Sequence, residues 1–252
     1  MISFAFLKKE LYELIRTPKL IIIGSVFLFF SITGVLSARF IEDIFRLFAS
    51  DLEITLPDPT HIQSWEQFFN NISSISMIVF LIMLTGSIAS EKHKGSVYLV
   101  LTKNMTRTSF VCSKVIAGII LFTGVYVLAL LVHMYYTWFL FDALLYDGYL
   151  ISVLAVYVLG IFFTMIAITL SIFLKTSTHA ALIAFAVYAL LNILTVFSGL
   201  NRFNPAGSIA IIYEGLAGKN VTSALLINIF VTLVLSVLLF LISLRSFSKQ
   251  EL

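Results

Sequence analysis

Cysteine and charged residues are scarce in this sequence. The single cysteine, Cys112, excludes an intrachain disulfide and a metal site built from several cysteines. Charged residues make up only 12% of the 252 residues, whereas 60% are hydrophobic and the mean hydropathy is +1.05. So little polar material cannot form a water-facing shell around a soluble domain. The composition therefore predicts a chain that folds within a lipid bilayer.

Sequence signatures of catalysis are also missing. The chain contains no phosphate-binding Gly-x-x-x-x-Gly-Lys-Ser/Thr, no His-Glu-x-x-His and no Gly-x-Ser-x-Gly. We therefore expect no catalytic residue, no metal and no cofactor bound by this chain, and no nucleic-acid partner. No Asp, Glu, Lys or Arg lies near the centre of an apolar run. Since transport coupled to protons or sodium usually needs an ionisable group at membrane depth, this class is disfavoured too.

Long apolar runs are what the sequence has in abundance. About twenty apolar residues cross a bilayer as a helix, because every backbone polar group must be satisfied within the segment. The sequence predicts an all-α membrane protein, one transmembrane domain over residues 1–252. The polar residues at the start of the second run suggest that this helix begins about a turn deeper. The six predicted spans are 19–37, 70–89, 115–137, 150–174, 179–199 and 223–244.

The distribution of cations predicts the orientation of these spans. Twelve of the sixteen Lys and Arg residues lie in one set of alternate segments, which includes both termini and the loop after the second span. The other set carries four cations and nine of the thirteen acids. Because cytoplasmic segments retain positive charge, we expect both termini in the cytoplasm and a multi-pass protein of the plasma membrane.

The first eighteen residues form a separate predicted element. Apolar residues such as Leu7, Leu11 and Leu14 recur at helical spacing. This pattern predicts an amphipathic helix in the membrane interface, followed by an elbow at Thr17-Pro18, where Thr17 caps the next helix. The alternative is a short positively charged anchor. The charged residues of this helix are Lys8, Lys9, Glu13 and Arg16.

The predicted cytoplasmic loop from Ser90 to Lys114, which contains Cys112, is longer than a connection needs. A short helical signal, residues 97–101, follows Gly95-Ser96, and Thr106 or Thr108 offers a cap for the next helix. The loop therefore predicts a docking site for a partner. The alternative is a cationic loop that serves topology alone.

The loop resembles that of type-2 ABC exporter permeases from bacteria, and Lys8 to Lys19 resembles the elbow helix of that family. The sequence departs from the family pattern at two positions: His93 stands where a second Glu is common, and Asn104 stands where Pro is common. The resemblance implies a dimer of this chain or a pair with a homologue, bound to two cytoplasmic ATPase subunits that hold ATP and Mg. It assigns 95–101 as the coupling helix and Ser208 to Leu216 as a short re-entrant helix on the outer side, for which a plain surface loop is the alternative. The loop residues that it assigns to ATPase contact are Glu91, Gly95, Ser96, Tyr98, Leu99, Leu101, Thr106 and Arg107.

Polar side chains inside the predicted spans are the candidates for a transport pathway. Without buried charge, such a pathway suits an amphipathic or lipid-like molecule, and we favour an amphipathic peptide. Membrane lipid is the other expected partner. Two alternatives stay open: a membrane-embedded enzyme acting on lipid, and a sensor or assembly subunit that does not transport. The pathway candidates are Tyr126, His133, Tyr157, Tyr188, Asn192 and Asn228.

Overall fold

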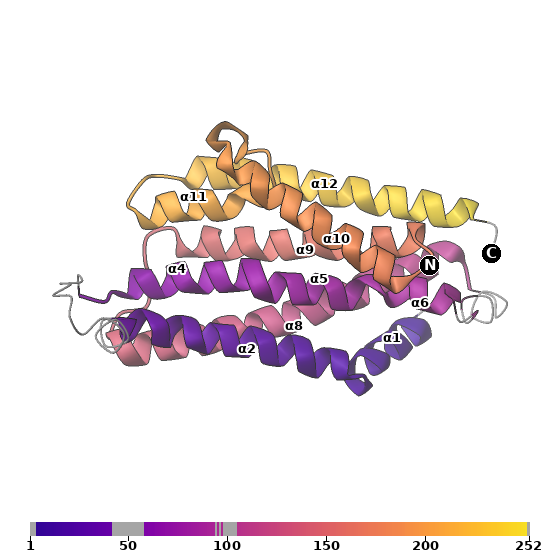
Figure 1. Ribbon diagram of the computed structural model, residues 1–252, viewed down its shortest axis with the longest axis horizontal. Coiled ribbons are helices and arrows are strands. Elements are labelled where there is room, and N and C mark those ends of the chain that lie inside the picture. The colour runs from indigo at the N-terminus through magenta and orange to yellow at the C-terminus, as the bar shows by residue number, and fades with distance from the viewer. Residues whose placement is uncertain (1–3, 42–57, 94, 96, 98–104, 251–252) are drawn as a thin grey trace.

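The computed structural model describes residues 4–41, 58–93, 95, 97 and 105–250, and this part of the chain contains helices and no strand. The helices lie side by side along the long axis of the molecule, and both chain ends lie at the same end of the bundle, which we name the terminal end (Figure 1). Six helical segments are long and apolar enough to cross a bilayer, which confirms the predicted number. They are α2 (Pro18–Arg39), α4 to α6 (His61–Lys92), α8 (Arg107–Phe141), α9 (Tyr149–Phe173), α10 with the turn η2 (Ser177–Val196) and α12 (Thr222–Lys249).

Helix α9 is the centre of the bundle. In its most apolar stretch 72% of the residues are buried, against 17% in α10 and 28% in α2 and α12. Large apolar side chains on the outer helices, including Phe185 and Phe230, are exposed. A water-soluble protein would bury such side chains, so these helices present their apolar faces to lipid or to a partner.

The second span begins earlier than the sequence suggested, and the prediction of a deeper start was wrong. Helix α4 (His61–Asn71) is opened by a capping box between Thr60 and Gln63, and it buries Trp65, Phe68 and Phe69. A π-helical turn, η1 (Ile72–Ser76), joins it to α5 (Met77–Thr85). The polar residues that suggested a boundary are satisfied within the fold: Ser73 and Ser74 donate to carbonyls four residues earlier, and Asn71 donates to the Phe30 carbonyl.

The third span also extends beyond its predicted start. Helix α8 begins at Arg107, because the Thr106 hydroxyl accepts a hydrogen bond from the Ser109 N–H at 3.2 Å and caps the helix. Of the two caps that the sequence offered, the structure uses Thr106. Cys112 therefore lies within a helix and not in a loop, which corrects the prediction for this residue.

A short apolar helix, α11 (Gly207–Leu216), lies between the fifth and sixth spans, as the sequence predicted for 208–216. Figure 1 shows it beside the start of α12, at the end of the bundle opposite the termini. Asn228 of α12 donates to the carbonyls of Asn201 and Asn204 at 2.9 and 2.7 Å, and Asn204 in turn donates to the Leu191 carbonyl of α10. These bonds hold the chain between α10 and α11 against α12.

Candidate functional site

The first helix, α1 (Phe4–Arg16), packs on the start of α8 at the terminal end. The last helical hydrogen bond of α1 runs from the Thr17 N–H to the Glu13 carbonyl at 3.0 Å, and Pro18 opens α2. The Thr17 side chain makes no cap hydrogen bond to α2, so the predicted cap was wrong. Phe6 packs against Phe110 of α8 with ring centroids 5.3 Å apart, and Phe110 stacks on Phe247 of α12 at the same distance. Phe110 and Phe247 are fully buried, so α1, α8 and α12 share a small aromatic core.

Five charged side chains from three helices meet beside this core, and we name them the charge cluster: Lys9, Glu10, Glu13, Glu91 and Lys114. The Lys114 Nζ lies 2.6 Å from Glu10 Oε2 of α1 and 2.8 Å from Glu91 Oε1 of α6 (Ser87–His93). The Lys9 Nζ lies 3.0 Å from Glu10 Oε1 and 2.6 Å from Glu13 Oε2. Because the side chains of Lys114 and Glu10 are only 4% and 6% exposed, the ion pair between them lies mostly out of water, whereas Lys9 and Glu13 are each 47% exposed.

The charges of this cluster stabilise one another. Burial alone disfavours the charged form of Lys9, but its hydrogen bond to Glu13 and the charges of Glu10 and Glu91 raise its pKa above the usual value. Burial likewise disfavours the Glu13 carboxylate, yet the hydrogen bond from Lys9 lowers the pKa of Glu13. The three carboxylates lie close enough to hold a metal ion. Here the ammonium groups of Lys9 and Lys114 bind between them and supply the positive charge.

Helix α6 is fixed to the central helix. The Ser171 hydroxyl of α9 accepts hydrogen bonds from the Ile88 and Ala89 N–H groups, both at 2.9 Å, and so satisfies the first turn of α6. Lys92, one turn further on, donates to the Ile172 carbonyl of α9 and to Gln250. The orientation of α6 is therefore set by α9 and by the end of the chain.

The residues after α6 enter the same core. Gly95 has a φ of 71°, a left-handed conformation that favours glycine, and its N–H donates to the Lys92 carbonyl. Val97 is fully buried in the cluster that also contains Phe6, Phe110 and Phe247. Gly95 and Val97, at the start of the predicted coupling helix, are therefore held by a backbone hydrogen bond and by core packing. Its other assigned residues, Ser96, Tyr98, Leu99 and Leu101, lie outside the described residues.

Arg107, at the start of α8, binds the end of α12. Its Nη1 donates to the carbonyls of Ser248 at 2.8 Å and Gln250 at 2.7 Å, with a longer contact of 3.4 Å to the Phe247 carbonyl. The last carbonyls of a helix have no partner within the helix, and a guanidinium is a favourable partner for them. The chain after the predicted coupling helix is therefore attached to the C-terminal segment.

We expect Arg107→Ala to loosen the last turn of α12. The carbonyls of Ser248 and Gln250 lose a charged donor, at a local cost of about 1.5–3 kcal/mol. Hydrogen exchange of residues 244–250 is the measurement, and exchange should rise there while α9 stays protected. Arg245→Ala is the matched control, since Arg245 is an exposed cation on the same helix end. Equal exchange in both variants would contradict the role assigned to Arg107.

The comparison with protein families agrees with this arrangement. A family model described as ABC-2 family transporter protein matches residues 4–252. The chain belongs to the ABC-2 transporter family. A comparison with curated proteins gave no match. As an ABC-2 protein, the chain is a membrane component of an ABC transporter and works with a cytoplasmic ABC ATPase, as the sequence resemblance implied.

Three pathway candidates of this ABC-2 protein lie in one aromatic layer between α4, α8 and α9. The Tyr126 hydroxyl donates to the Val153 carbonyl at 2.9 Å, and its ring lies 6.0 Å from that of Tyr157. His133 is fully buried, stacks on Phe68 and lies 3.3 Å from the Thr137 hydroxyl. In the single chain these side chains join helices to one another.

The other three candidates lie apart from that layer. Tyr188 of α10 donates to the Ser73 carbonyl in the π-helical turn at 2.9 Å, and Asn192 donates to the Tyr188 carbonyl one turn back. Asn228 holds the chain before α11, as described above. The six residues thus fall into separate groups, each bonded to backbone carbonyls or to a neighbouring helix.

Sequence reasoning missed three side chains of the terminal end. Glu10 was left out of the list of charged elbow residues, yet it is the most buried member of α1, at 5% exposure. It lies four residues after Phe6 and four before Leu14, so its position on the apolar face was a usable signal. Ser171 and Phe247 gave no such signal, because each acts on a helix far away in the sequence.

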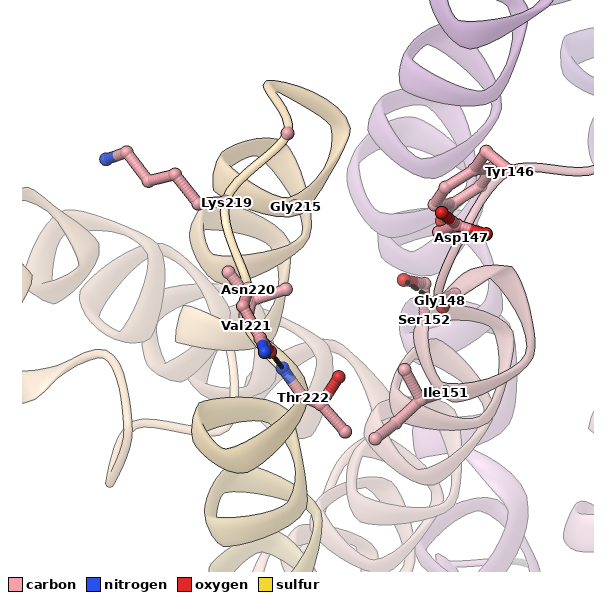
Figure 2. A pocket seen from close by; sticks show the side chains of 11 residues that line it. Tyr146, Asp147, Gly148, Ile151, Ser152, Gly215, Lys219, Asn220, Val221 and Thr222 are labelled. Carbon is pink, nitrogen blue, oxygen red and sulfur yellow. Dashed lines mark hydrogen bonds between the residues drawn. The ribbon is translucent and has the colours of Figure 1, made fainter.

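A polar pocket lies at the other end of this ABC-2 protein, between the α8–α9 and α11–α12 connections (Figure 2). Its volume is about 360 Å³. Figure 2 shows Tyr146, Asp147 and Ser152 on one side and Asn220 and Thr222 on the other, with the Lys219 side chain pointing away. Lys219 instead pairs with Glu214 at 3.2 Å.

Proposed function

We propose that this protein is the permease subunit of an ABC exporter, which forms the substrate pathway as a dimer and is driven by two cytoplasmic ATPases that bind ATP and Mg. The observation that carries the proposal is the attachment of the segment between α6 and α8 at both of its ends. On one side Glu91 belongs to the charge cluster, and on the other Arg107 binds the end of α12.

This attachment suits a segment that receives force from a partner. A displacement of residues 95–105 acts on Val97, which is buried among side chains of α1, α8 and α12. It also acts on Lys114 and Glu10 through Glu91. Packed cores and bonded ion pairs move as units, so closure of the ATPases would shift these helices together.

The same proposal orients the protein in the membrane. We place the terminal end in the cytoplasm, because twelve of the sixteen Lys and Arg residues belong to the segments predicted on that side. Helix α1 then acts as the elbow helix in the inner interface of the plasma membrane, and α11 with the polar pocket lies on the outer side, where the substrate leaves.

We propose an amphipathic peptide or a lipid-like molecule as the substrate. The predicted span centres carry no Asp, Glu, Lys or Arg, so a small ion would find no compensating charge. An amphipathic molecule needs only apolar contact and a few hydrogen bonds, and exposed Leu, Ile and Phe side chains cover the outer helices.

Replacement of Tyr98, Leu99 and Leu101 by Glu tests the coupling helix. We expect the ATPase partner to co-purify with the unchanged chain and to be lost from the triple variant, because apolar contacts at the docking site are replaced by charges. Lys249→Glu, a charge change at an exposed position of the same end, is the matched control. An intact complex in the triple variant would overturn the assignment. Transport of a labelled peptide into vesicles that contain both partners then distinguishes an exporter from a sensor.

A further inference from the structure

An apolar groove lies at the surface where α1, α2 and α8 meet. Its volume is about 370 Å³. Two glycines, Gly24 of α2 and Gly124 of α8, leave open space along it, since a Cβ on either one would meet no atom within 4 Å. The other lining residues are Leu11, Leu14, Ile15, Leu20, Ile120, Leu121, Val125 and Leu128. Every side chain in this lining is aliphatic, so the groove offers contact to a hydrocarbon chain and no hydrogen bond from a side chain.

The charged residues of α1 differ in their partners. Glu10 and Glu13 face the charge cluster, where Lys9 and Lys114 bind them. Lys8 and Arg16 are exposed instead, and neither forms an ion pair with any residue that the structure describes; the Arg16 guanidinium lies 5.4 Å from the centre of the Tyr12 ring. Lys8 precedes the groove residues Leu11 and Ile15 by three and seven positions, so it lies on the same side of the helix.

The start of α2 adds positive potential beside the groove. Leu20, in its first turn, lines the groove. Thr17 makes no side-chain hydrogen bond to the first N–H groups of α2, and the first turn contains no acid. The unpaired N–H groups of a helix start favour an anion. Among the described residues, an apolar groove and exposed cations without an ion pair thus lie together.

We propose that this groove binds an anionic phospholipid. One acyl chain lies along the groove over Gly24 and Gly124, and the phosphate group lies near Lys8, Arg16 and the start of α2. The lipid would thereby fix the angle between α1 and α2. A second copy of this chain is the competing occupant, but a two-fold contact at this groove would bring the same cationic edge of both copies together. The proposal does not depend on the transport function.

Native mass spectrometry of the full-length chain in detergent is the test, with phosphatidylglycerol and phosphatidylcholine of equal acyl length as probes. We expect the unchanged chain to retain phosphatidylglycerol about tenfold better than phosphatidylcholine. Gly124→Leu fills the groove without a clash at the Cβ, and it should lower this retention by about tenfold. The double variant Lys8→Ala/Arg16→Ala should bind both lipids equally, because the positive edge is gone.

Two control variants show whether the loss of lipid is specific to the groove and its cations. Gly199→Leu adds the same side chain at a glycine that also has open space, away from the groove, and Lys175→Ala removes an exposed cation elsewhere. Both should retain phosphatidylglycerol like the unchanged chain. Unchanged retention in Gly124→Leu would overturn the proposal. A dimer that dissociates in Gly124→Leu while the lipid count stays the same would also overturn it and would assign the groove to the second copy.

Discussion

Replacement of Lys114 by Met is expected to destabilise the terminal end more than any other single change. The Lys114 ammonium binds Glu10 at 2.6 Å and Glu91 at 2.8 Å, and its side chain is 4% exposed. Methionine has a similar length but leaves two largely buried carboxylates without this cation. Breaking a buried pair in this way costs about 3–5 kcal/mol, equivalent to a fall of roughly 10 °C in the unfolding midpoint. Thermal unfolding of the purified protein in detergent is the measurement.

A variant without the charges of Lys114, Glu10 and Glu91 distinguishes the stability of the protein from the coupling between α1, α6 and α8. In Lys114→Met/Glu10→Gln/Glu91→Gln no buried charge is left unpaired, so we expect most of the lost stability to return. Helices α1, α6 and α8 would then lack the ion pairs that join them. ATPase activity of the assembled transporter should therefore respond poorly to substrate, although the protein is folded. A triple variant as unstable as Lys114→Met would show that the ion pairs are not the source of the loss.

Gly160→Ala is expected to separate α8 from α9. A Cβ on Gly160 would lie 1.9 Å from the ring of Phe122, which is fully buried. The ring has little room to move, because Phe27, Phe80 and Tyr126 pack around it. Overpacking of a core costs about 1–3 kcal/mol, whereas the helix propensity of Ala favours the variant by about 1 kcal/mol. We therefore expect a net loss, measured as a lower unfolding midpoint.

A second substitution should reverse this loss. Phe122→Leu removes part of the ring that Gly160→Ala displaces, so the double variant should be more stable than the sum of the two single changes predicts. Gly124→Ala is the matched control, because it makes the same change on α8 where no atom lies within 4 Å. It should leave the midpoint unchanged or raise it. A Gly160→Ala protein as stable as Gly124→Ala would contradict the close packing described for Phe122.

Secondary structure was the part of the fold that the sequence predicted best. In α12, 16 of the 22 residues from Ser223 to Leu244 are Leu, Ile, Val or Phe, so length and composition suffice to predict the span. The start of α4 was predicted wrongly for the opposite reason. Asn71 and Ser73 look like a boundary in the sequence, but Ser73 bonds to the Phe69 carbonyl of the preceding turn, and Asn71 bonds to the Phe30 carbonyl, which only a folded bundle places nearby.

The candidate site was predicted in part. Glu91, Thr106 and Arg107 were found through the family resemblance, and the structure places them around the base of the predicted coupling segment. Glu10 was missed, although its place on the apolar face of α1 marks it as buried. Ser171 was beyond reach, because one hydroxyl among many becomes an anchor only when α6 lies against α9.

By itself, the sequence determined that this chain is an α-helical membrane protein with six spans and that it belongs with ABC-2 permeases. Apolar length and charge distribution are local properties, and a bilayer allows few structures that satisfy them. Only the tertiary structure decided that Lys114 joins α1 to α6, that Arg107 binds the end of α12, and that Gly24 and Gly124 share one groove. Each of these depends on which helix faces which. That choice is made by packing between residues far apart in the chain, and such contacts leave no periodic pattern in the sequence.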